Sequence, residues 1–111
     1  MSSGFDDRGK AFESKWAHDE ELRFKVMARR NMMLGRWAAT EMGLKGDAIE
    51  AYGKAVVQAD FEEAGDDDVF RKVRGDFDTA KVDHSDHLIR RKMEELLAEA
   101  AQQIMSENGK K

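Results

Sequence analysis

The sequence predicts an all-α protein, an up-and-down bundle of three long helices and one short helix that carries a mobile N-terminal arm. Three observations support this fold class. The 111-residue chain has no proline, its apolar residues recur at helical spacing from Leu22 onward, and no stretch alternates between apolar and polar residues as a strand does. Because short connections favour antiparallel neighbours, we expect residues 19–111 to form the bundle and residues 1–18 to form the arm.

The arm differs from the other predicted helices in the width of its apolar stripe. At about 100° per residue, Phe5, Phe12 and Trp16 fall within about 40° on a helix, whereas a helix that packs on a core usually presents about 100° or more. Charged residues flank the stripe, with Arg8 and Lys15 on one edge and Asp6 and Glu13 on the other. A segment that folds on a partner and a helix that packs on its own bundle both fit this pattern.

Acidic N-caps and glycines bound the first two helices of the predicted bundle. Asp19 is the candidate N-cap of a helix that runs to Met42, and Asp47 is that of a second helix that stops at Gly65. The residues on their apolar faces are Leu22, Val26, Met27, Met33, Leu34, Trp37 and Ala38 in the first helix, and Ile49, Tyr52, Val56 and Ala59 in the second.

The third predicted helix is short, and the fourth shows the clearest amphipathic pattern. The short helix is capped within the aspartates at 66–68, and the last helix begins near Ser85 or Asp86. We expect the short helix to bury Val69, Phe70, Val73 and Phe77, and the last helix to bury Ile89, Met93, Leu96, Leu97, Ala100 and Ile104.

Charged residues interrupt the apolar arcs of the first two helices. Arg23 and Arg30 lie on the arc of the first helix, and Asp60 and Glu63 lie on that of the second. Because a buried arginine requires a carboxylate, we expect Arg30 to pair with Asp60. Arg23 is expected near Glu63 or Asp67. In the alternative interpretation, Arg23 and Arg30 bind an anion such as a nucleotide phosphate.

Composition and charge exclude several classes of function. The chain has no cysteine, and therefore no disulfide and no thiolate nucleophile. The net charge is −4, and the basic residues of the first helix have no aromatic platform or glycine-rich phosphate loop beside them, so we expect no nucleic-acid partner. Neither a signal peptide nor a run of about 18 apolar residues is present, which predicts a soluble, cytoplasmic protein that does not insert into a membrane.

The histidines give no strong signal for a metal site. The spacing of His84 and His87 is compatible with zinc ligation but is also typical of a helix start, which we favour. His18 lies at the junction of arm and bundle, where an imidazole acts either as a pH-sensitive hinge or as an ordinary surface side chain. Since no other catalytic constellation is present, we expect a protein that is not an enzyme and requires no metal or cofactor.

Several segments resemble the zeta-type inhibitor subunit of the bacterial rotary ATP synthase, and the resemblance covers nearly the whole chain. The residues that carry it are Phe5-Asp6-Asp7-Arg8, Ala11-Phe12-Glu13, Ala28-Arg29-Arg30-Asn31, the stretch from Ala59 to Asp66, and Ile89-Arg90-Arg91-Lys92-Met93.

The resemblance implies that the arm wedges into a catalytic alpha/beta interface of the synthase head, touches the gamma subunit and blocks rotation in the direction of hydrolysis. It assigns the inhibitory contacts to Phe5, Asp6, Asp7, Arg8, Phe12 and Glu13, to which the stripe adds Lys15 and Trp16. It also implies weak binding of ATP or ADP, a monomer when free, and a location at the cytoplasmic face of the membrane-bound synthase. A nucleotide-binding regulatory module and a non-inhibitory adaptor of the synthase are the alternatives.

Overall fold

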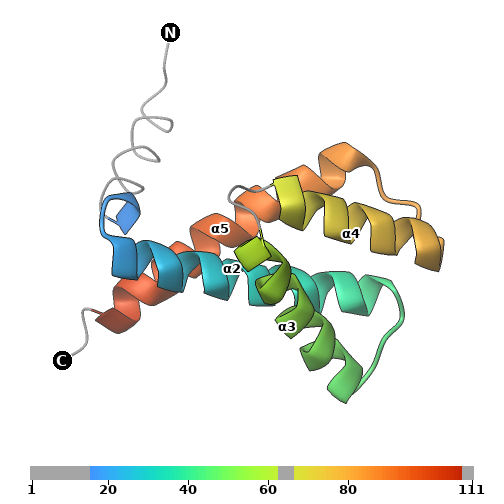
Figure 1. Ribbon diagram of the computed structural model, residues 1–111, viewed down its shortest axis with the longest axis horizontal. Coiled ribbons are helices and arrows are strands. Elements are labelled where there is room, and N and C mark those ends of the chain that lie inside the picture. Colours follow the sequence, from blue (N-terminus) through green and yellow to red (C-terminus); the bar gives the residue numbers. More distant parts are fainter. Residues whose placement is uncertain (1–15, 63–66, 109–111) are drawn as a thin grey trace, which may run out of the picture.

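The protein is all-α, as predicted, in a computed structural model that describes residues 16–62 and 67–108. Figure 1 shows the four helices in chain order, α2 (Glu20–Glu41), α3 (Asp47–Glu62), α4 (Asp67–Ala80) and α5 (Asp86–Asn108). The first and last are the longest, with 22 and 23 residues, and α4 is the shortest with 14. Within the two described ranges there is no strand. None of the helices there is long and apolar enough to cross a membrane.

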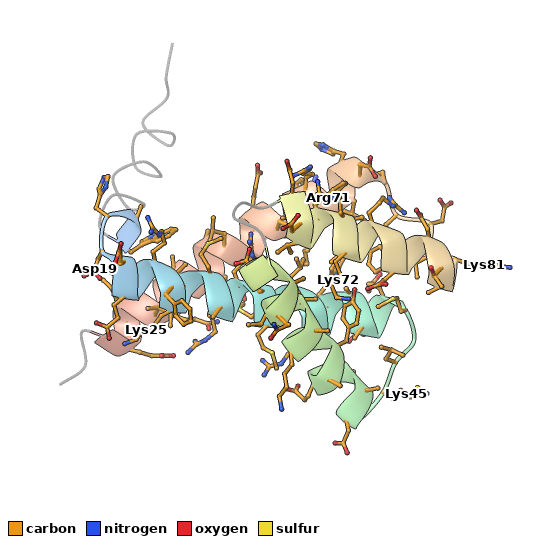
Figure 2. All side chains as sticks on the ribbon, viewed as in Figure 1. Asp19, Lys25, Lys45, Arg71, Lys72 and Lys81 are labelled. Carbon is orange, nitrogen blue, oxygen red and sulfur yellow. The ribbon has the colours of Figure 1, made fainter. Side chains whose placement is uncertain are left out.

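Side-chain caps explain where α2 and α5 begin. Asp19, labelled at the start of α2 in Figure 2, accepts a hydrogen bond from the backbone N–H of Leu22 at 3.1 Å. Ser85 Oγ accepts one from the backbone N–H of Leu88 at 3.0 Å. After α2 the chain turns at Gly43, whose φ of 85° is a conformation that residues with a Cβ rarely adopt. These starts agree with the capping residues predicted from the sequence.

Successive helices reverse direction, and α2 is the helix around which the others pack. It contacts α3, α4 and α5. In Figure 1, α2 and α5 lie along each other, although they are the first and last helices of the described chain, while α3 and α4 diverge from them. The N-terminal end of α2 therefore lies beside the C-terminal end of α5.

The core consists of two clusters of buried side chains. The central cluster joins all four helices and contains Leu34, Ala38, Val56, Val69, Val73, Phe77, Ile89, Met93 and Leu96. The basal cluster lies where α2 and α5 meet and contains Trp16, Val26, Ala100, Ala101 and Ile104. Most of these residues are on the apolar faces predicted from helical spacing, and Trp16 and Ala101 are the exceptions.

Candidate functional site

The predicted inhibitory arm falls mostly outside the described residues. Phe5, Asp6, Asp7, Arg8, Phe12, Glu13 and Lys15 all precede residue 16, where the described chain begins. What the structure does show is the base of the arm and the bundle surface around it.

Trp16 belongs to the bundle, so its assignment to a free arm was wrong. Its side chain is only 4% exposed and packs in the basal cluster against Val26 of α2 and Ala100 of α5. The physical reason is that α5 presents the small side chains of Ala100 and Ala101 at this position, which leaves room for an indole. The narrow stripe that suggested a partner-binding helix therefore loses one of its three members to the protein's own core.

A short turn links Trp16 to α2. The backbone N–H of Asp19 donates to the carbonyl of Trp16 at 3.2 Å. Arg23 Nη1 donates to the carbonyl of Ala17 at 3.3 Å, from one turn inside α2. His18, between these residues, is exposed. The base of the arm is thus held by its backbone as well as by the indole.

Arg30 and Asp60 meet through a third residue that the sequence analysis missed. Arg30 is 1% exposed, and its Nε donates to Asn31 Oδ1 at 2.7 Å. Asn31 Nδ2 in turn donates to Asp60 Oδ2 at 3.0 Å. The predicted height of the two charged residues along the hairpin was right, but the predicted direct ion pair was wrong. A carboxamide has both an acceptor and a donor, so Asn31 can stand between a guanidinium and a carboxylate.

The position of Arg23 also differs from the prediction, and by more than that of Arg30. It was placed on the buried arc, but it is exposed and bonds to the carbonyl of Ala17. Of its two predicted neighbours, Glu63 lies outside the described residues, and Asp67 instead accepts a hydrogen bond from Arg90 Nη2 at 3.2 Å. The prediction failed because Arg23 lies in the first turn of α2. There a long side chain can reach past the core to solvent and to the preceding turn.

A pocket of about 360 Å³ opens between the N-terminal half of α2 and the C-terminal part of α3. Its polar residues are Glu20, Arg23, Asn31 and Asp60, and its apolar residues are Phe24, Met27, Ala28 and Val57. Phe24 is 57% exposed, which makes it the most exposed large apolar side chain of the described chain. Because two carboxylates face one guanidinium, the lining is acidic.

Ion pairs between helices link α2 to α5 and to α3. Arg29 of α2 donates from Nη1 and Nη2 to the two carboxylate oxygens of Glu107 on α5, both at 3.0 Å, and from Nη1 to Gln103 Oε1 at 2.7 Å. Arg36 of α2 forms a similar fork with Glu50 of α3 at 3.0 and 3.1 Å. Two arginines of α2 therefore link it to α5 and to α3 through their side chains.

His84 takes part in a contact between the α4–α5 loop and the end of α2. Its Nε2 lies 2.7 Å from Glu41 Oε1, and its ring stacks on Trp37 with centroids 5.9 Å apart. In the part of the chain that the structure describes, no group of three or more His, Cys, Asp or Glu could hold a metal ion.

A second polar contact joins α3 to α4. Tyr52 donates its hydroxyl proton to Asp76 Oδ2 at 2.7 Å, and Lys72 Nζ donates to the same oxygen at 3.1 Å. Lys72 extends from α4 toward α3 in Figure 2. Burial raises the pKa of Tyr52 far above its usual value, and the hydrogen bond to the Asp76 carboxylate raises it further.

Comparison with known proteins agrees with the family resemblance of the sequence. The model of a family described as ATPase inhibitor subunit zeta matches residues 1–103. A solved solution NMR structure is 46% identical, with a TM-score of 0.69, over 78% of this chain and 98% of that chain. No curated protein matches.

Proposed function

Since this chain belongs to the ATPase inhibitor subunit zeta family, we propose that its N-terminal segment inserts at a catalytic interface of the ATP synthase head and stops ATP hydrolysis. The observation that carries this proposal is the extent of the family match, which begins at residue 1 and so includes the arm as well as the bundle. The role needs no chemistry from this chain, because an inserted segment blocks rotation sterically.

The anchors of the proposed arm are Phe5 and Phe12, seven residues apart, which lie on one side of a helix. An amphipathic helix that binds in a groove uses anchors at this spacing. Ordering such a segment costs several kcal/mol, which burial of the two aromatic rings offsets. Charged neighbours of both signs, Asp6, Asp7, Arg8, Glu13 and Lys15, would pair with groups along the two walls of the groove.

The proposed partners are the alpha and beta subunits that form the interface and the gamma subunit that turns between them. In this proposal the arm fills the interface between the static subunits and also touches the subunit that turns. The protein would act as a monomer at the cytoplasmic face of the membrane-bound synthase.

Hydrolysis by the isolated synthase head tests the proposal. Phe12→Ala should weaken inhibition by about 30-fold, since truncating a central aromatic anchor typically costs about 2 kcal/mol. Lys10→Ala is the matched control, because Lys10 projects away from the stripe and should change inhibition by less than about threefold. Equal inhibition by both variants would contradict the arm mechanism, and binding without inhibition by the wild-type chain would favour an adaptor.

Weak binding of ATP or ADP is a second candidate function, supported by the pocket at Arg23. Its volume of about 360 Å³ is in the range of small-molecule sites, and Arg23 is among its lining residues. Arg30 is 1% exposed and does not line this pocket, so Arg23 is the arginine that can reach a phosphate. The acidic lining predicts low affinity for a triphosphate.

Calorimetric titration with ATP tests this second function. Arg23→Ala should reduce the affinity by about tenfold, the loss expected for one charge-assisted contact. Lys25→Ala is the control, because Lys25 lies on the same helix but does not line the pocket. If both variants bind ATP as the wild type does, the pocket is not the nucleotide site.

A further inference from the structure

The seat of Trp16 suggests a role that differs from partner binding. The indole lies between α2 and α5, and Ala100 and Ala101 on α5 are both fully buried at 0% exposure. Two adjacent alanines give this part of α5 a flat, shallow surface, and Val26 of α2 closes the other side. The indole of the basal cluster comes from the first described residue, directly after residues 1–15.

We infer that Trp16 is the positioning residue of the inhibitory arm: it fixes the place and direction from which residues 1–15 leave the bundle, and it does not contact the synthase. This inference rests on the proposed function. In this inference Trp16 is not part of the surface that binds the partner. It instead sets the orientation of that surface relative to the bundle.

Backbone contacts fix the same joint independently of the indole. The Trp16 carbonyl accepts from Asp19 N–H at 3.2 Å, and the Ala17 carbonyl accepts from Arg23 Nη1 at 3.3 Å. The Asp19 side chain caps α2 by accepting from Leu22 N–H at 3.1 Å. A side chain alone would leave the backbone free to swivel, whereas these three bonds define the path of the chain into α2.

An ion pair between α2 and α5 lies beside the slot. Arg29 lies one turn after Val26 on α2, and Glu107 lies one turn after Ile104 on α5. Their two hydrogen bonds of 3.0 Å each form a fork beside the basal cluster. Because α2 and α5 are joined on this flank, the position of the indole is set by the whole bundle.

The orientation of the arm at Trp16 matters because the proposed contacts with the synthase lie far from this residue. If residues 1–15 bind as a helix, they extend about 22 Å from the joint. A rotation of about 20° at the base would move the far end by about 8 Å, which is more than the pitch of an α-helix, about 5.4 Å. A pre-oriented arm also avoids the entropic cost that a freely tethered segment pays on binding.

The indole is held by packing and not by a hydrogen bond. Trp16 Nε1 is buried and has no hydrogen-bond partner. A phenylalanine at this position would keep an aromatic ring in the slot and remove the unsatisfied donor. A partner contact through the indole N–H would instead be lost in that variant, so the two substitutions Trp16→Phe and Trp16→Ala separate positioning from contact.

The experiment compares these variants of the full chain in the hydrolysis assay, below the unfolding temperature of each. Trp16→Ala should weaken inhibition by at least about tenfold, toward the potency of a free peptide of residues 1–15, because the arm is then tethered but not aimed. Trp16→Phe should stay within about threefold of the wild type. Val73→Ala, which truncates a fully buried residue of the central cluster, controls for lost stability and should leave inhibition unchanged.

Two results would overturn the inference. Inhibition by folded Trp16→Ala as strong as that of the wild type would show that the joint does not matter. A loss in Trp16→Phe as large as that in Trp16→Ala would show that the indole touches the synthase.

A measurement without the synthase separates this inference from the proposed function. The chain has two tryptophans, so a Trp37→Phe variant reports Trp16 fluorescence alone. We expect blue-shifted emission and protection from acrylamide. If Trp16 is exposed, the positioning role is wrong, even if Phe12→Ala still weakens inhibition. If Trp16 is buried but the protein does not slow hydrolysis, the packing of Trp16 stands and the inhibitory function of the arm is refuted.

Discussion

Gly35 of α2 and Gly53 of α3 meet backbone to backbone. A Cβ on Gly35 would lie 2.5 Å from the Cα of Gly53, a distance that real Cβ atoms essentially never show, and 3.2 Å from Val56 Cγ2, which is a tight contact. On the other side, a Cβ on Gly53 would lie 2.8 Å from Met32 Sδ. The two helices can therefore approach as closely as they do only because position 35 lacks a side chain.

Gly35→Ala should destabilise the bundle by about 1–3 kcal/mol, the usual cost of overpacking a core. The opposing atom is backbone, so the strain can be relieved only by moving α3 away from α2. Urea unfolding measures the effect. Gly75→Ala is the control, because a Cβ there meets nothing within 4 Å and alanine favours a helix interior by about 1 kcal/mol. The prediction fails if both substitutions are stabilising.

Asn31→Ala should cost about 2–3 kcal/mol, because it removes a bonded acceptor from the buried Arg30 guanidinium and a donor from Asp60. Asp60→Ala should cost less, about 1 kcal/mol, since Asp60 is only half-buried and Asn31 would still serve Arg30. Chemical denaturation of the two variants gives this order. A larger loss for Asp60→Ala would show that the carboxylate, and not the carboxamide, compensates the arginine.

Because of Tyr52, the free energy of unfolding of the bundle should fall as the pH becomes alkaline. Its pKa is raised in the folded protein, by burial first and by Asp76 second. The folded state therefore favours the neutral phenol, and this stabilisation is complete below the unfolded pKa of about 10 and is lost as the pH rises above it. Relative to Tyr52→Phe, the wild type should lose up to about 1.4 kcal/mol per pH unit above pH 10.

Urea unfolding of both proteins at pH 8 and pH 11 checks this difference. Tyr52 is the single tyrosine of the chain, so phenolate absorbance reports its ionisation directly. At pH 8, Tyr52→Phe should be destabilised by about 1 kcal/mol through loss of the bond to Asp76. Parallel pH profiles of the two proteins would contradict the raised pKa.

Where the chain is shortened should decide how stable the bundle remains. A chain that begins at residue 16 keeps the basal cluster and should unfold at nearly the same temperature as the full protein. A chain that begins at residue 19 lacks the indole and should lose about 3–5 kcal/mol, as for other buried tryptophans. Thermal unfolding followed by circular dichroism distinguishes the two. Equal midpoints would show that Trp16 contributes nothing to the core.

The sequence predicted those parts of the fold that local chemistry determines. Asp19 and Ser85 are caps because their side chains accept N–H groups three residues later, a pattern visible in the sequence itself. Phe77 and Ile89 are buried because helical periodicity places them on an apolar face. The family resemblance was likewise carried by short local motifs.

What the sequence could not predict depends on neighbours that are distant along the chain. Trp16 is buried because Ala100 and Ala101 lie opposite it, and no local pattern connects residues more than 80 positions apart. The bond from Arg29 to Glu107 likewise joins residues 78 positions apart. Asn31 offered a weak signal, since asparagine is a poor helix former and stands next to Arg30 in the middle of a helix.

The pairing of α2 with α5 has a consequence for the order of events during synthesis. The slot for Trp16 is built from α5, so it does not exist until residues 100–104 have left the ribosome. Until then Trp16 of a nascent chain has no α5 surface on which to pack. The last of the four described helices is thus the one that completes the seat of Trp16, and a nascent chain that has not yet folded α5 leaves the indole without its alanine wall.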